Sequence, residues 1–427
     1  METVTVVGLG YVGLPMACLC AEKGYKTYGF DIDMNKVNLI NQNQSPIDDE
    51  YVTNKLKNLR NKIHATINPA DCIPNSDVVI VCVPTPVDKN NSPDLTALME
   101  SISIISKFIK QNTLFVIEST IYPGTIEEIV VPILKKQKFD VYKNDLFVAH
   151  CPERIDPGNK KWTIENLPRV VGGMTKEATK KAAEFYRSII DADVMELSNI
   201  KVAEATKIME NTFRDINIAF VNEMAQSFDK AGIDIIEVIK GSSTKPFAFM
   251  PHYPGAGVGG HCISIDPYYL IEKAKQLGFQ HKFLLLAREI NNSMPHYTVE
   301  LLEEQLKKLK KAIKNAKVGI LGVAYKANVD DTRESPAFEI INILKTKGAD
   351  IFVFDPHVKK ESNAKDLDEL FNKSDYIILA TDHNDFKNMD LEKLRKHKIL
   401  IVIDGRNCLD KEKIKSMGIL YHGIGRS

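Results

Sequence analysis

The sequence predicts an α/β protein in which two doubly wound domains are joined by a helical central domain with a long helix. Short apolar runs alternate with helical stretches in the first half of the chain, and the same alternation restarts near residue 311. Between them, Ile200–Lys230 carries apolar residues at helical spacing without proline or glycine. We therefore divide the chain into domains at 1–198, 199–310 and 311–427.

Each strand of the first domain is predicted from a short apolar run. These runs lie at 3–8, 27–31, 77–83, 114–119, Phe147–His150 and 169–172, and a helical stretch at 13–23 separates the first two. Strands that alternate with helices normally pair in parallel, so we expect a parallel sheet.

The long helix and the last domain follow in order. At 1.5 Å per residue, the helix would be about 45 Å long, which is longer than a small domain needs. We expect it to link two domains and to carry the interface of a homodimer or a dimer of dimers. Apolar runs at 318–323, 351–355, 376–381 and 399–404 predict the strands of the second doubly wound domain.

Composition excludes several classes of function. The 56 basic and 56 acidic side chains cancel, so we expect neither nucleic acid nor a membrane surface as a partner. No run approaches the roughly 20 apolar residues of a membrane span. Of the seven cysteines, those at 18, 20, 72 and 82 lie in apolar runs, which favours a soluble protein in the reducing cytoplasm. Because CxxC, HExxH and EF-hand spacings are absent, we expect no metal.

A glycine motif follows the first strand directly. Gly8, Gly10 and Gly13 form a GxGxxG pattern between a strand and a helix, the context in which a Rossmann-like fold binds a dinucleotide. Asp31 lies eighteen residues beyond Gly13, where its carboxylate can bind a ribose and repel a 2′-phosphate. This arrangement favours NAD over NADP. A turn that binds nothing, with Asp31 as a helix cap, is the alternative. The expected cofactor set also includes Tyr11, Val12 and Lys36.

Two further strands are predicted to end in polar residues. Thr85 follows one strand and Thr120 another, at the carboxyl edge where doubly wound sheets bind ligands, so both are candidate cofactor contacts. The second doubly wound domain begins with a strand and Gly322 but lacks the full GxGxxG pattern. It need not bind a dinucleotide.

A glycine-rich loop at 254–262 ends in the candidate nucleophile, Cys262. A thiol here could add to an aldehyde, hold a thiohemiacetal for hydride transfer and leave as a thiolate after thioester hydrolysis. One site could thus perform two oxidations. A lone cysteine is more often a small buried hydrophobic residue. The flanking glycines, His261 and Asp266 favour the catalytic interpretation.

The long helix contributes a second group of candidates. Lys207 and Asn211 are four residues apart and share a face, with Glu204 and Arg214 close to it. A solvated surface contact is the alternative for these side chains. The segment CPER at 151–154 follows a strand end and could place Glu153 and Arg154 at the mouth of the first domain, or form a structural turn.

Several of these segments together resemble the UDP-glucose/GDP-mannose dehydrogenase family over residues 1 to about 410. The matching motifs are GLGYVGLP at 8–15, VPTP at 83–86, EST at 118–120, CPER at 151–154, AEATK at 203–207, ENTFRD at 210–215, GVGGHC at 257–262 and DDTRESPA at 330–337. The resemblance implies an NAD-dependent enzyme that oxidises the C6 alcohol of a nucleotide sugar to a carboxylate, with Cys262 as nucleophile.

The resemblance also implies roles for individual residues. Lys207 would exchange protons and stabilise the oxyanion, Asn211 would assist it, and Asp266 would help to activate water. Glu153 would take part in acid–base steps and Thr120 would position water. The implied substrate contacts are Arg154, Ile155, Lys207, Asn211, Arg214, His252, Gly257, Gly259, Tyr325, Lys326, Arg333 and Arg406.

Within the family, GGHC and FRDINIAF resemble the branch that acts on UDP-N-acetylhexosamines. We expect UDP-N-acetylmannosamine as substrate, and surface glycan synthesis as the use of the product. Residues 245–255 look closer to UDP-N-acetylglucosamine 6-dehydrogenases, so that epimer is an alternative, as is UDP-glucose. Two other readings are a simple hydroxyacid or phosphogluconate-type dehydrogenase, which needs no thiol, and a regulatory protein that binds NAD or nucleotide without turnover.

Overall fold

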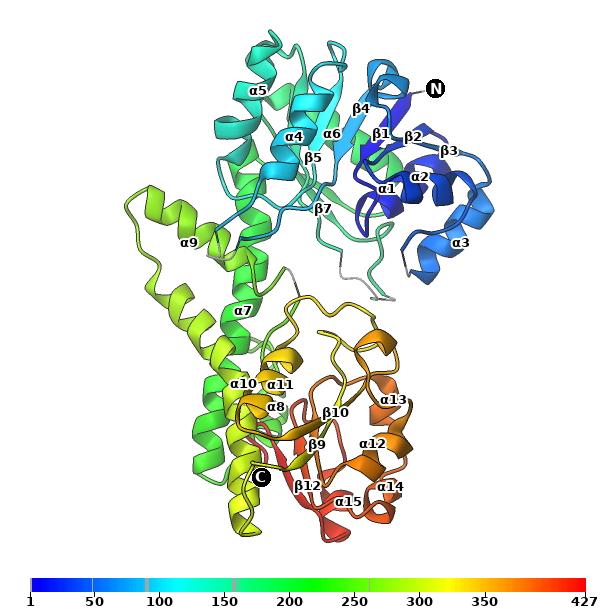
Figure 1. Cartoon of the computed structure of the whole chain (residues 1–427). Coiled ribbons are helices and arrows are strands. Elements are labelled where there is room, and N and C mark those ends of the chain that lie inside the picture. The colour runs from blue at the N-terminus through cyan, green and yellow to red at the C-terminus, as the bar shows by residue number, and fades with distance from the viewer. Residues whose placement is uncertain (1, 48, 89–91, 156–158, 160, 261) are drawn as a thin grey trace. The chain divides into compact units, whose positions relative to one another are not determined.

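The computed structural model describes residues 2–47, 49–88, 92–155, 159, 161–260 and 262–427. The chain forms two compact units (Figure 1), each described by itself. The first unit comprises Met1–Glu210 and Tyr268–Phe279, and the second comprises Asn211–Pro267 and Gln280–Ser427. Both contain a doubly wound sheet, which confirms the predicted fold class.

The sheet of the first unit has the strand order β3-β2-β1-β4-β5-β6-β7-β8. All neighbouring strands pair in parallel except β6 and β7, which are antiparallel. The strands are β1 (Thr3–Val7), β2 (Lys26–Phe30), β3 (Ile63–Thr66), β4 (Val78–Val81), β5 (Leu114–Ile117), β6 (Phe147–His150), β7 (Arg169–Gly173) and β8 (Val194–Glu196). The predicted purely parallel sheet is therefore wrong at one pair.

Helices cover this sheet. Nine of the ten residues of α1 (Gly13–Glu22) are buried, so this helix contributes heavily to the core beside β1. The other helices assigned here are α2 (Met34–Asn41), α3 (Glu50–Leu59), α4 (Thr96–Ile105), α5 (Val131–Lys136), α6 (Lys176–Ile189), most of α9 (Asp266–Gln276) and the first third of α7 (Ile200–Lys230). A π-helical turn at Ile126–Val130 precedes α5, and short 3₁₀ turns lie at Pro69–Asp71, Ile73–Asn75 and Val141–Lys143.

The sheet of the second unit has five parallel strands in the order β10-β9-β11-β12-β13. They are β9 (Lys317–Leu321), β10 (Asp350–Phe354), β11 (Tyr376–Leu379), β12 (Ile401–Asp404) and β13 (Leu420–Gly423). The helices are the rest of α7, then α8 (Ile235–Ser242), α10 (Lys282–Lys308), α11 (Pro336–Thr346), α12 (Leu367–Lys373), α13 (Asn384–Lys387), α14 (Glu392–Lys396) and α15 (Lys411–Ser416), with a 3₁₀ turn at Lys359–Glu361.

Several predicted strands extend one or two residues too far at their carboxyl ends. The residues beyond those ends leave the ladder and bind elsewhere. Gly8 turns with a φ of +87°, Asp355 accepts backbone amides at positions 323 and 324, and the Thr381 hydroxyl donates to the Ala324 carbonyl. These departures from the ladder create the edge at which doubly wound sheets bind ligands.

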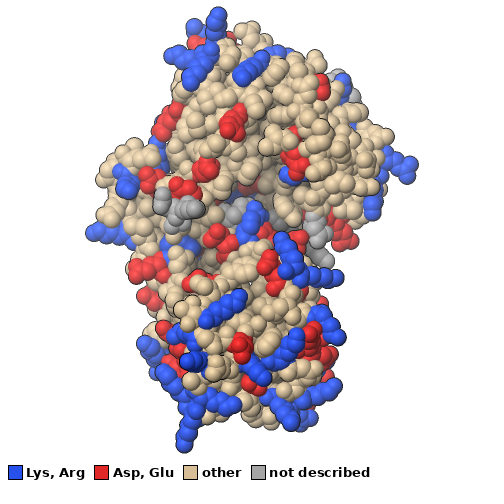
Figure 2. All heavy atoms as spheres, viewed as in Figure 1, with Lys and Arg blue, Asp and Glu red and all other residues tan. Residues whose placement is uncertain are grey.

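Surface charge, helix hydropathy and possible metal ligands each bear on the predictions from composition. Basic and acidic side chains are interspersed over both units on the face that Figure 2 shows, in keeping with their equal numbers. In the described part of the chain, no helix combines the length and apolar character needed to cross a membrane. Nor do the described residues contain a group of three His, Cys, Asp or Glu side chains that could hold a metal.

Candidate active site

The three glycines of the first turn meet different surroundings. A Cβ on Gly8 would lie 2.8 Å from the Cys82 carbonyl oxygen, and one on Gly13 would lie 1.9 Å from the Gly8 carbonyl oxygen. A Cβ on Gly10 would meet no described atom within 4 Å. Gly8 and Gly13 are therefore required by packing, whereas Gly10 opens the backbone toward a ligand. This is the pattern that a dinucleotide pyrophosphate needs at a helix N-terminus.

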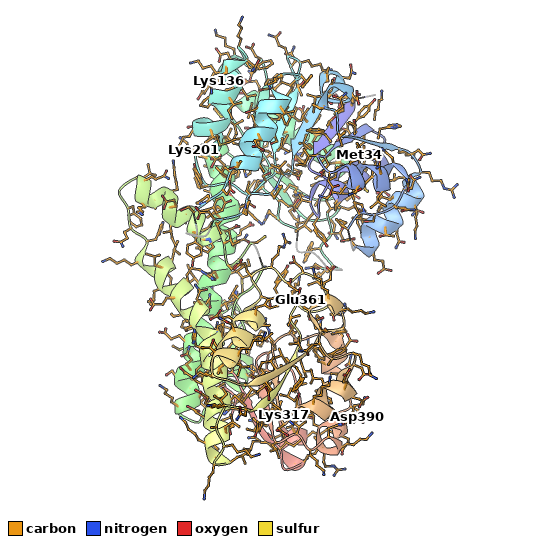
Figure 3. All side chains as sticks on the ribbon, viewed as in Figure 1. Met34, Lys136, Lys201, Lys317, Glu361 and Asp390 are labelled. Atoms are coloured by element: carbon orange, nitrogen blue, oxygen red, sulfur yellow. The ribbon has the colours of Figure 1, made fainter. Side chains whose placement is uncertain are left out.

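Asp31 directly follows β2, beside this turn. Its two oxygens accept one backbone N–H each, from Leu9 at 2.7 Å and from Asp33 at 2.9 Å, and the Lys36 ammonium lies 3.7 Å away. A carboxylate has about four acceptor positions, so capacity remains for ribose hydroxyls. The helix cap of α2, which begins at Met34 (Figure 3), is Asp33. The residues present fit NAD, and the alternative role of Asp31 as a helix cap is wrong.

The predicted contacts around the turn differ in exposure. Tyr11 is exposed and Val12 is half-buried. Thr85 and Thr120 lie together, because the Thr85 hydroxyl donates to the Thr120 carbonyl at 2.7 Å. The Tyr269 hydroxyl from α9 donates to the Thr85 carbonyl at 2.5 Å. The segments that follow β4 and β5 are thus joined, and the predicted contacts of Thr85 and Thr120 with the cofactor stay predictions.

Glu204 ties the loop after Thr120 to the long helix. It is fully buried on α7, and its oxygens accept the N–H groups of Gly124 at 2.5 Å and Ile126 at 2.9 Å. Burial raises the pKa of this carboxyl to about 7, against the effect of the two N–H donors. Glu204 therefore caps the helical segment that follows Thr120, a role that its position beside Lys207 in the sequence did not indicate.

Glu153 and Arg154 are held by different partners. Glu153 is buried, and one of its oxygens lies 3.0 Å from a guanidinium nitrogen of Arg169, while the other accepts the Ile155 N–H. Arg154 binds Glu210 through two nitrogens at 2.6 and 3.1 Å and also donates to the Pro168 carbonyl. Both side chains are fixed, and the Arg154 charge is shared with a carboxylate.

Lys207 is buried on α7, one turn before Asn211. Within the described residues, its ammonium forms neither an ion pair nor a hydrogen bond with the protein. A buried ammonium without a protein partner is costly, so its retention at this position points to a ligand group as partner. The surface alternative for this lysine is wrong.

Three of the predicted catalytic residues lie together in the second unit. The Asn211 amide donates to the Asp266 carboxylate at 2.5 Å, and the Asp266 N–H donates to the Cys262 carbonyl at 2.8 Å. Cys262 is half-buried, forms no disulfide and lies four residues before the start of α9. The positive end of a helix dipole favours a thiolate near its N-terminus. His261 lies outside the described residues.

Arg333 adds a positive charge near this thiol. The pKa of Arg333 is raised, first by its hydrogen bonds with Asp331 and also by the negative charge of Cys262. Its guanidinium lies 2.5 Å from the Asp331 carboxylate. Arg333 is therefore within electrostatic reach of Cys262 and favours its ionised form.

The glycine loop packs against the segment that follows β9. The Gly260 N–H donates to the Arg333 carbonyl at 3.0 Å, and Cβ atoms on Gly259 and Gly260 would lie 2.8 and 2.7 Å from the Tyr325 side chain. Gly257 and Gly260 have φ values of +136° and +81°, which glycine tolerates best. The structure thus places Tyr325 and Arg333 beside the loop, and the half-buried Lys326 follows Tyr325 directly.

The start of the loop is anchored from two sides. The Ala256 N–H donates to the Gly405 carbonyl at 3.0 Å, and a Cβ on Gly255 would lie 2.9 Å from the Arg406 guanidinium. The Gly255 N–H donates to the Asn222 amide oxygen at 3.0 Å. Arg406 is therefore a neighbour of the loop, and its predicted contact with the substrate stays a prediction.

Asn222 belongs to a buried polar chain between α7 and α10 that sequence reasoning missed. Its amide donates to Asn291 at 2.9 Å, Asn291 donates to Asp215 at 2.8 Å, and Asp215 binds Arg288 at 2.6 Å. All four side chains are buried. The signal was partial, since only Asp215 falls in a motif, ENTFRD.

Two predicted substrate residues lie apart from these contacts. Arg214 is exposed and has no ion pair with another described residue. The Nδ1 atom of His252 lies 3.1 Å from the Met250 carbonyl, and its ring packs on Phe213 at a centroid distance of 6.2 Å. Neither side chain hydrogen-bonds to Cys262, Asn211 or Asp266 within the described chain.

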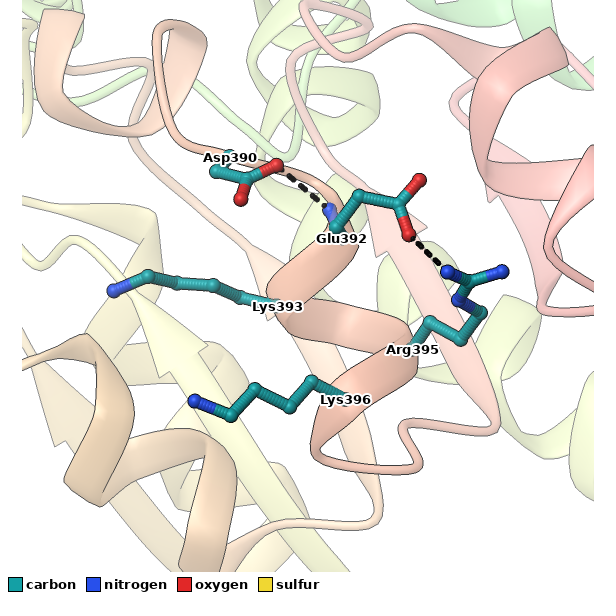
Figure 4. A pocket seen from close by; sticks show the side chains of 5 residues that line it. All are labelled: Asp390, Glu392, Lys393, Arg395 and Lys396. Atoms are coloured by element: carbon teal, nitrogen blue, oxygen red, sulfur yellow. Dashed lines mark hydrogen bonds and ion pairs between the residues drawn. The ribbon is translucent and has the colours of Figure 1, made fainter.

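A hollow on the surface of α14 is no rival site. It is lined by Asp390, Glu392, Lys393, Arg395 and Lys396 (Figure 4). Arg395 binds Glu392 at 2.8 Å, and Lys393 binds Asp368 at 2.8 Å. These exposed ion pairs neutralise most of the charged side chains around the hollow. The residues that line the hollow include no nucleophile and no buried base.

Comparisons with known proteins agree with this geometry. Models of the UDP-glucose/GDP-mannose dehydrogenase family match as the NAD binding domain at 2–190, the central domain at 201–293 and the UDP binding domain at 319–411. A UDP-N-acetyl-D-mannosamine dehydrogenase of Methanococcus maripaludis is 38% identical, over 100% of this chain and 97% of its own.

Two further proteins extend the comparison. A UDP-N-acetyl-D-glucosamine 6-dehydrogenase of Pseudomonas aeruginosa is also 38% identical, over 96% of this chain and 98% of its own. The solved structure of a UDP-D-ManNAc dehydrogenase from Pyrococcus horikoshii superposes with a TM-score of 0.93 at 35% identity, covering 100% of this chain and 99% of that one. With its dinucleotide turn and its thiol loop both in place, the chain belongs to the UDP-glucose/GDP-mannose dehydrogenase family and is an NAD-dependent dehydrogenase of nucleotide sugars.

Proposed function

We propose that the protein oxidises the C6 alcohol of UDP-N-acetyl-D-mannosamine to the carboxylate in two NAD-dependent steps. The observation that carries this proposal is the position of the Cys262 residue, which forms no disulfide and lies four residues before α9, beside the hydrogen-bonded pair Asn211 and Asp266. A one-step alcohol oxidation needs no such nucleophile. The product, a UDP-N-acetylmannosaminuronate, would supply surface polysaccharide synthesis.

The chemistry divides between the cofactor and the protein. When bound, NAD would accept one hydride from C6 in each oxidation, and the proton of the oxidised hydroxyl would leave through Lys207, to which we assign proton exchange. Lys207 donates to the C6 oxygen where negative charge develops, with Asn211 as a second donor. The Cys262 thiolate adds to the aldehyde carbon, so that a C–S bond forms and the carbonyl oxygen takes a proton. The second oxidation leaves a thioester.

Hydrolysis of the thioester completes the reaction. Water adds to the thioester carbon, the C–S bond breaks, and Cys262 leaves as a thiolate while the product becomes a carboxylate. We assign water activation to Asp266, water positioning to Thr120 and acid–base assistance to Glu153. One nucleotide sugar, two NAD⁺ and one water would thus give the uronate, two NADH and three protons.

The remaining assignments follow the same proposal. The cofactor contacts are Gly8, Gly10, Tyr11, Val12, Gly13, Asp31, Lys36, Thr85 and Thr120, and the substrate contacts are those proposed from the sequence, with Tyr325, Arg333 and Arg406 supported by their packing on the thiol loop. The domain division at 1–198, 199–310 and 311–427 is likewise a proposal. The three family matches support it.

A dimer in the cytoplasm is the proposed working state. Large apolar side chains of the second unit are exposed on α7 and in the segment before the thiol loop, namely Phe213, Phe220, Phe247, Met250 and Tyr253. Such a group of side chains is typical of an interface between subunits. None of the seven cysteines forms a disulfide, which favours a reducing compartment. A mass near 48.0 kDa by light scattering would contradict the dimer.

The proposed reaction is tested by counting NADH per sugar. Wild type, Cys262→Ala and Cys408→Ala are compared with UDP-N-acetylmannosamine at saturating NAD. Cys408 is the control, a half-buried thiol of the second unit to which we assign no role in the reaction. We expect two NADH per sugar from wild type and Cys408→Ala, and no carboxylate from Cys262→Ala. One NADH per sugar, unaffected at Cys262, would contradict the proposal and indicate a simple alcohol dehydrogenase.

The C2 epimer is tested in the same assay. UDP-N-acetylglucosamine is the second candidate, because the Pseudomonas aeruginosa relative is as similar as the Methanococcus maripaludis one. UDP-glucose is the third substrate to include. The substrate with the highest kcat/KM identifies the epimer, and a preference for either of the other two would overturn our choice of the mannosamine.

A further inference from the structure

A cluster of buried ionisable side chains lies at the carboxyl edge of the first sheet. Glu118 follows β5, Glu153 lies three residues after β6, and Arg169 begins β7. Because β7 runs antiparallel to β6, its first residue reaches the edge at which β6 ends. Glu118, Arg169 and Tyr186 of α6 are 1% exposed or less. Ligands bind doubly wound sheets at this edge.

The two carboxylates have separate hydrogen-bond partners. Glu153 lies 3.0 Å from Arg169 through one oxygen and accepts the Ile155 N–H with the other. Glu118 accepts the Tyr186 hydroxyl at 2.5 Å and the Cys82 thiol at 3.5 Å. Two nitrogens of the Arg169 guanidinium make no hydrogen bond within the described chain, although they are buried. The guanidinium thus has donor capacity beyond its bond to Glu153.

The charges in this cluster do not balance. With both carboxylates ionised, two negative charges face the single buried positive charge of Arg169. Burial raises the pKa of Glu118 to about 7, against the attraction of Arg169 and with added repulsion from Glu153. The other groups near Glu118 are Tyr186, Cys82, Cys151 and Cys20, and burial raises the pKa of each, so they stay neutral at physiological pH. One proton per cluster is therefore exchanged near neutrality.

We propose that Glu118 and Arg169 are positioning residues for Glu153: the guanidinium fixes the Glu153 carboxylate, and the proton on Glu118 sets how strongly. The inference rests on the proposed function, in which Glu153 assists acid–base steps. With Glu118 protonated, Arg169 acts as counter-charge for Glu153 alone. With Glu118 ionised, the guanidinium serves two carboxylates and holds Glu153 less strongly. Activity should therefore rise as Glu118 loses its proton.

The position of the cluster separates it from a purely structural ion pair. Glu118 lies two residues before Thr120, which we assign to water positioning, and Arg169 binds Glu153 directly. Glu204 provides the contrast, because it is an equally buried carboxyl with a pKa raised by burial to about 7, yet it binds only backbone N–H groups. Its substitution is thus a matched control.

The kinetic test compares kcat and KM from about pH 6 to pH 9 for wild type, Glu118→Gln and Glu204→Gln. We expect the wild-type kcat to fall on the acid side with a midpoint near 7. Glu118→Gln should lose this step and have a kcat about tenfold lower at alkaline pH, with KM for NAD within about twofold. Glu204→Gln should retain the step. A midpoint that persists in Glu118→Gln, or disappears in Glu204→Gln, would overturn the inference.

A second variant tests the role of the guanidinium fork. Arg169→Lys keeps the charge but not the planar donor set. We expect its kcat to fall at least tenfold with an altered acid midpoint, while KM for NAD stays within about twofold. Parallel loss of NAD binding and folding, with the midpoint unchanged in the residual activity, would instead make Arg169 a structural residue.

An infrared titration without substrate separates this inference from the proposed function. In Glu204→Gln, we expect a buried carboxylic acid C=O band that disappears as the pH rises through about 7, and the added substitution Glu118→Gln should remove it. A band that titrates identically in both proteins would overturn the placement of the proton. A band that behaves as expected in a protein that oxidises no nucleotide sugar would overturn the proposed function, and with it the role of Glu153.

Discussion

The two sheets of this molecule begin with the same turn but use it differently. Gly8 and Gly322 follow the first strand of each sheet with φ values of +87° and +86°, and each donates its N–H to the last residue of the neighbouring strand, at 2.8 and 2.9 Å. The residue directly after each neighbouring strand is an aspartate, Asp31 after β2 and Asp355 after β10. The backbone plan is shared.

The difference lies in which polar groups the protein already uses. In the first turn, the Gly10 N–H has no acceptor within the described chain, and α1 begins at Gly13. In the second, the corresponding Ala324 donates to Asp355, and the next helix begins only at Pro336. Asp355 is fully buried and accepts from the N–H groups of Val323, Ala324, His357 and Val358 and from the His383 ring.

The comparison teaches that ligand capacity depends on donors and acceptors left over after folding, not on the fold. Asp31 has unused acceptor positions and Asp355 has none to spare. The second turn uses its N–H donors and its aspartate within the protein. Tyr325 and Arg333, which follow this turn, pack on the thiol loop.

The largest effect is expected from Gly13→Ala. The new Cβ would lie 1.9 Å from the Gly8 carbonyl oxygen, which is backbone and cannot rotate away. We expect the first unit to lose about 3 kcal/mol or more of unfolding free energy. Trp162, the single tryptophan, lies in this unit, so its fluorescence in a denaturant titration reports the loss. The corresponding residue of the second turn is Ala327, which already carries a Cβ. An unchanged unfolding midpoint in Gly13→Ala would contradict the packing role of Gly13.

Asp355→Asn should have the next largest effect, about 3 kcal/mol, in the second unit. An asparagine would place an NH2 group, which can only donate, against N–H groups that now donate to the Asp355 carboxylate. Burial acts to raise the pKa of Asp355, but hydrogen bonds from His383 and from the Val323 and Ala324 amides hold it below its usual range.

The sign of the pH dependence follows from that lowered pKa. Asp355 stabilises the second unit above about pH 4, and this contribution is lost as the pH falls further. Hydrogen exchange of residues 317–404 in steps from about pH 4 down to about pH 2 measures it, with Asp355→Asn flattening the acid-side loss. Equal protection in variant and wild type at pH 7 would show that the second aspartate is not required as described.

Much of the fold and of the site followed from local patterns. The glycine turn, Asp31 and the strands around them are contiguous segments whose spacing carries their meaning. The strands at Ile63–Thr66 and Val194–Glu196 escaped because three or four residues with few apolar side chains give no periodic signal. Asp355 also escaped, since its saturation depends on partners such as His383, which is 28 positions away.

The buried polar groups were the hardest to predict. Arg169 stands at the start of an apolar run, where nothing in the sequence marks it as the partner of Glu153. Asn222 binds the thiol loop through Gly255, 33 positions later, and no motif contains both. Such contacts arise when distant segments pack, so only a three-dimensional structure shows them.

Gly10→Ala gives the first turn the residue that the second turn has at the corresponding position, Ala324. We expect it to weaken NAD binding without affecting folding. The added methyl group meets no described atom within 4 Å, so stability should be unchanged within about 0.5 kcal/mol. It would stand where the pyrophosphate approaches, and we expect NAD to bind about tenfold more weakly. Calorimetric titration with NAD measures the affinity. Wild-type affinity would show that Gly10 does not face the pyrophosphate.

The smallest expected effect comes from Asp31→Asn, and it tests the other half of the comparison. The amide keeps an acceptor for the Leu9 N–H but removes the charge that would repel a 2′-phosphate, and it frees the Lys36 ammonium 3.7 Å away. We expect NAD to bind about fivefold more weakly and NADP to gain relative to it, a change near 1 kcal/mol. Ratios of kcat/KM for the two cofactors measure the shift. Because Asp31 retains unused acceptor positions whereas those of Asp355 are all occupied, only Asp31→Asn should alter cofactor preference. A change in the NAD-to-NADP ratio of kcat/KM in Asp355→Asn would mean that the two turns are less independent than their hydrogen bonds indicate.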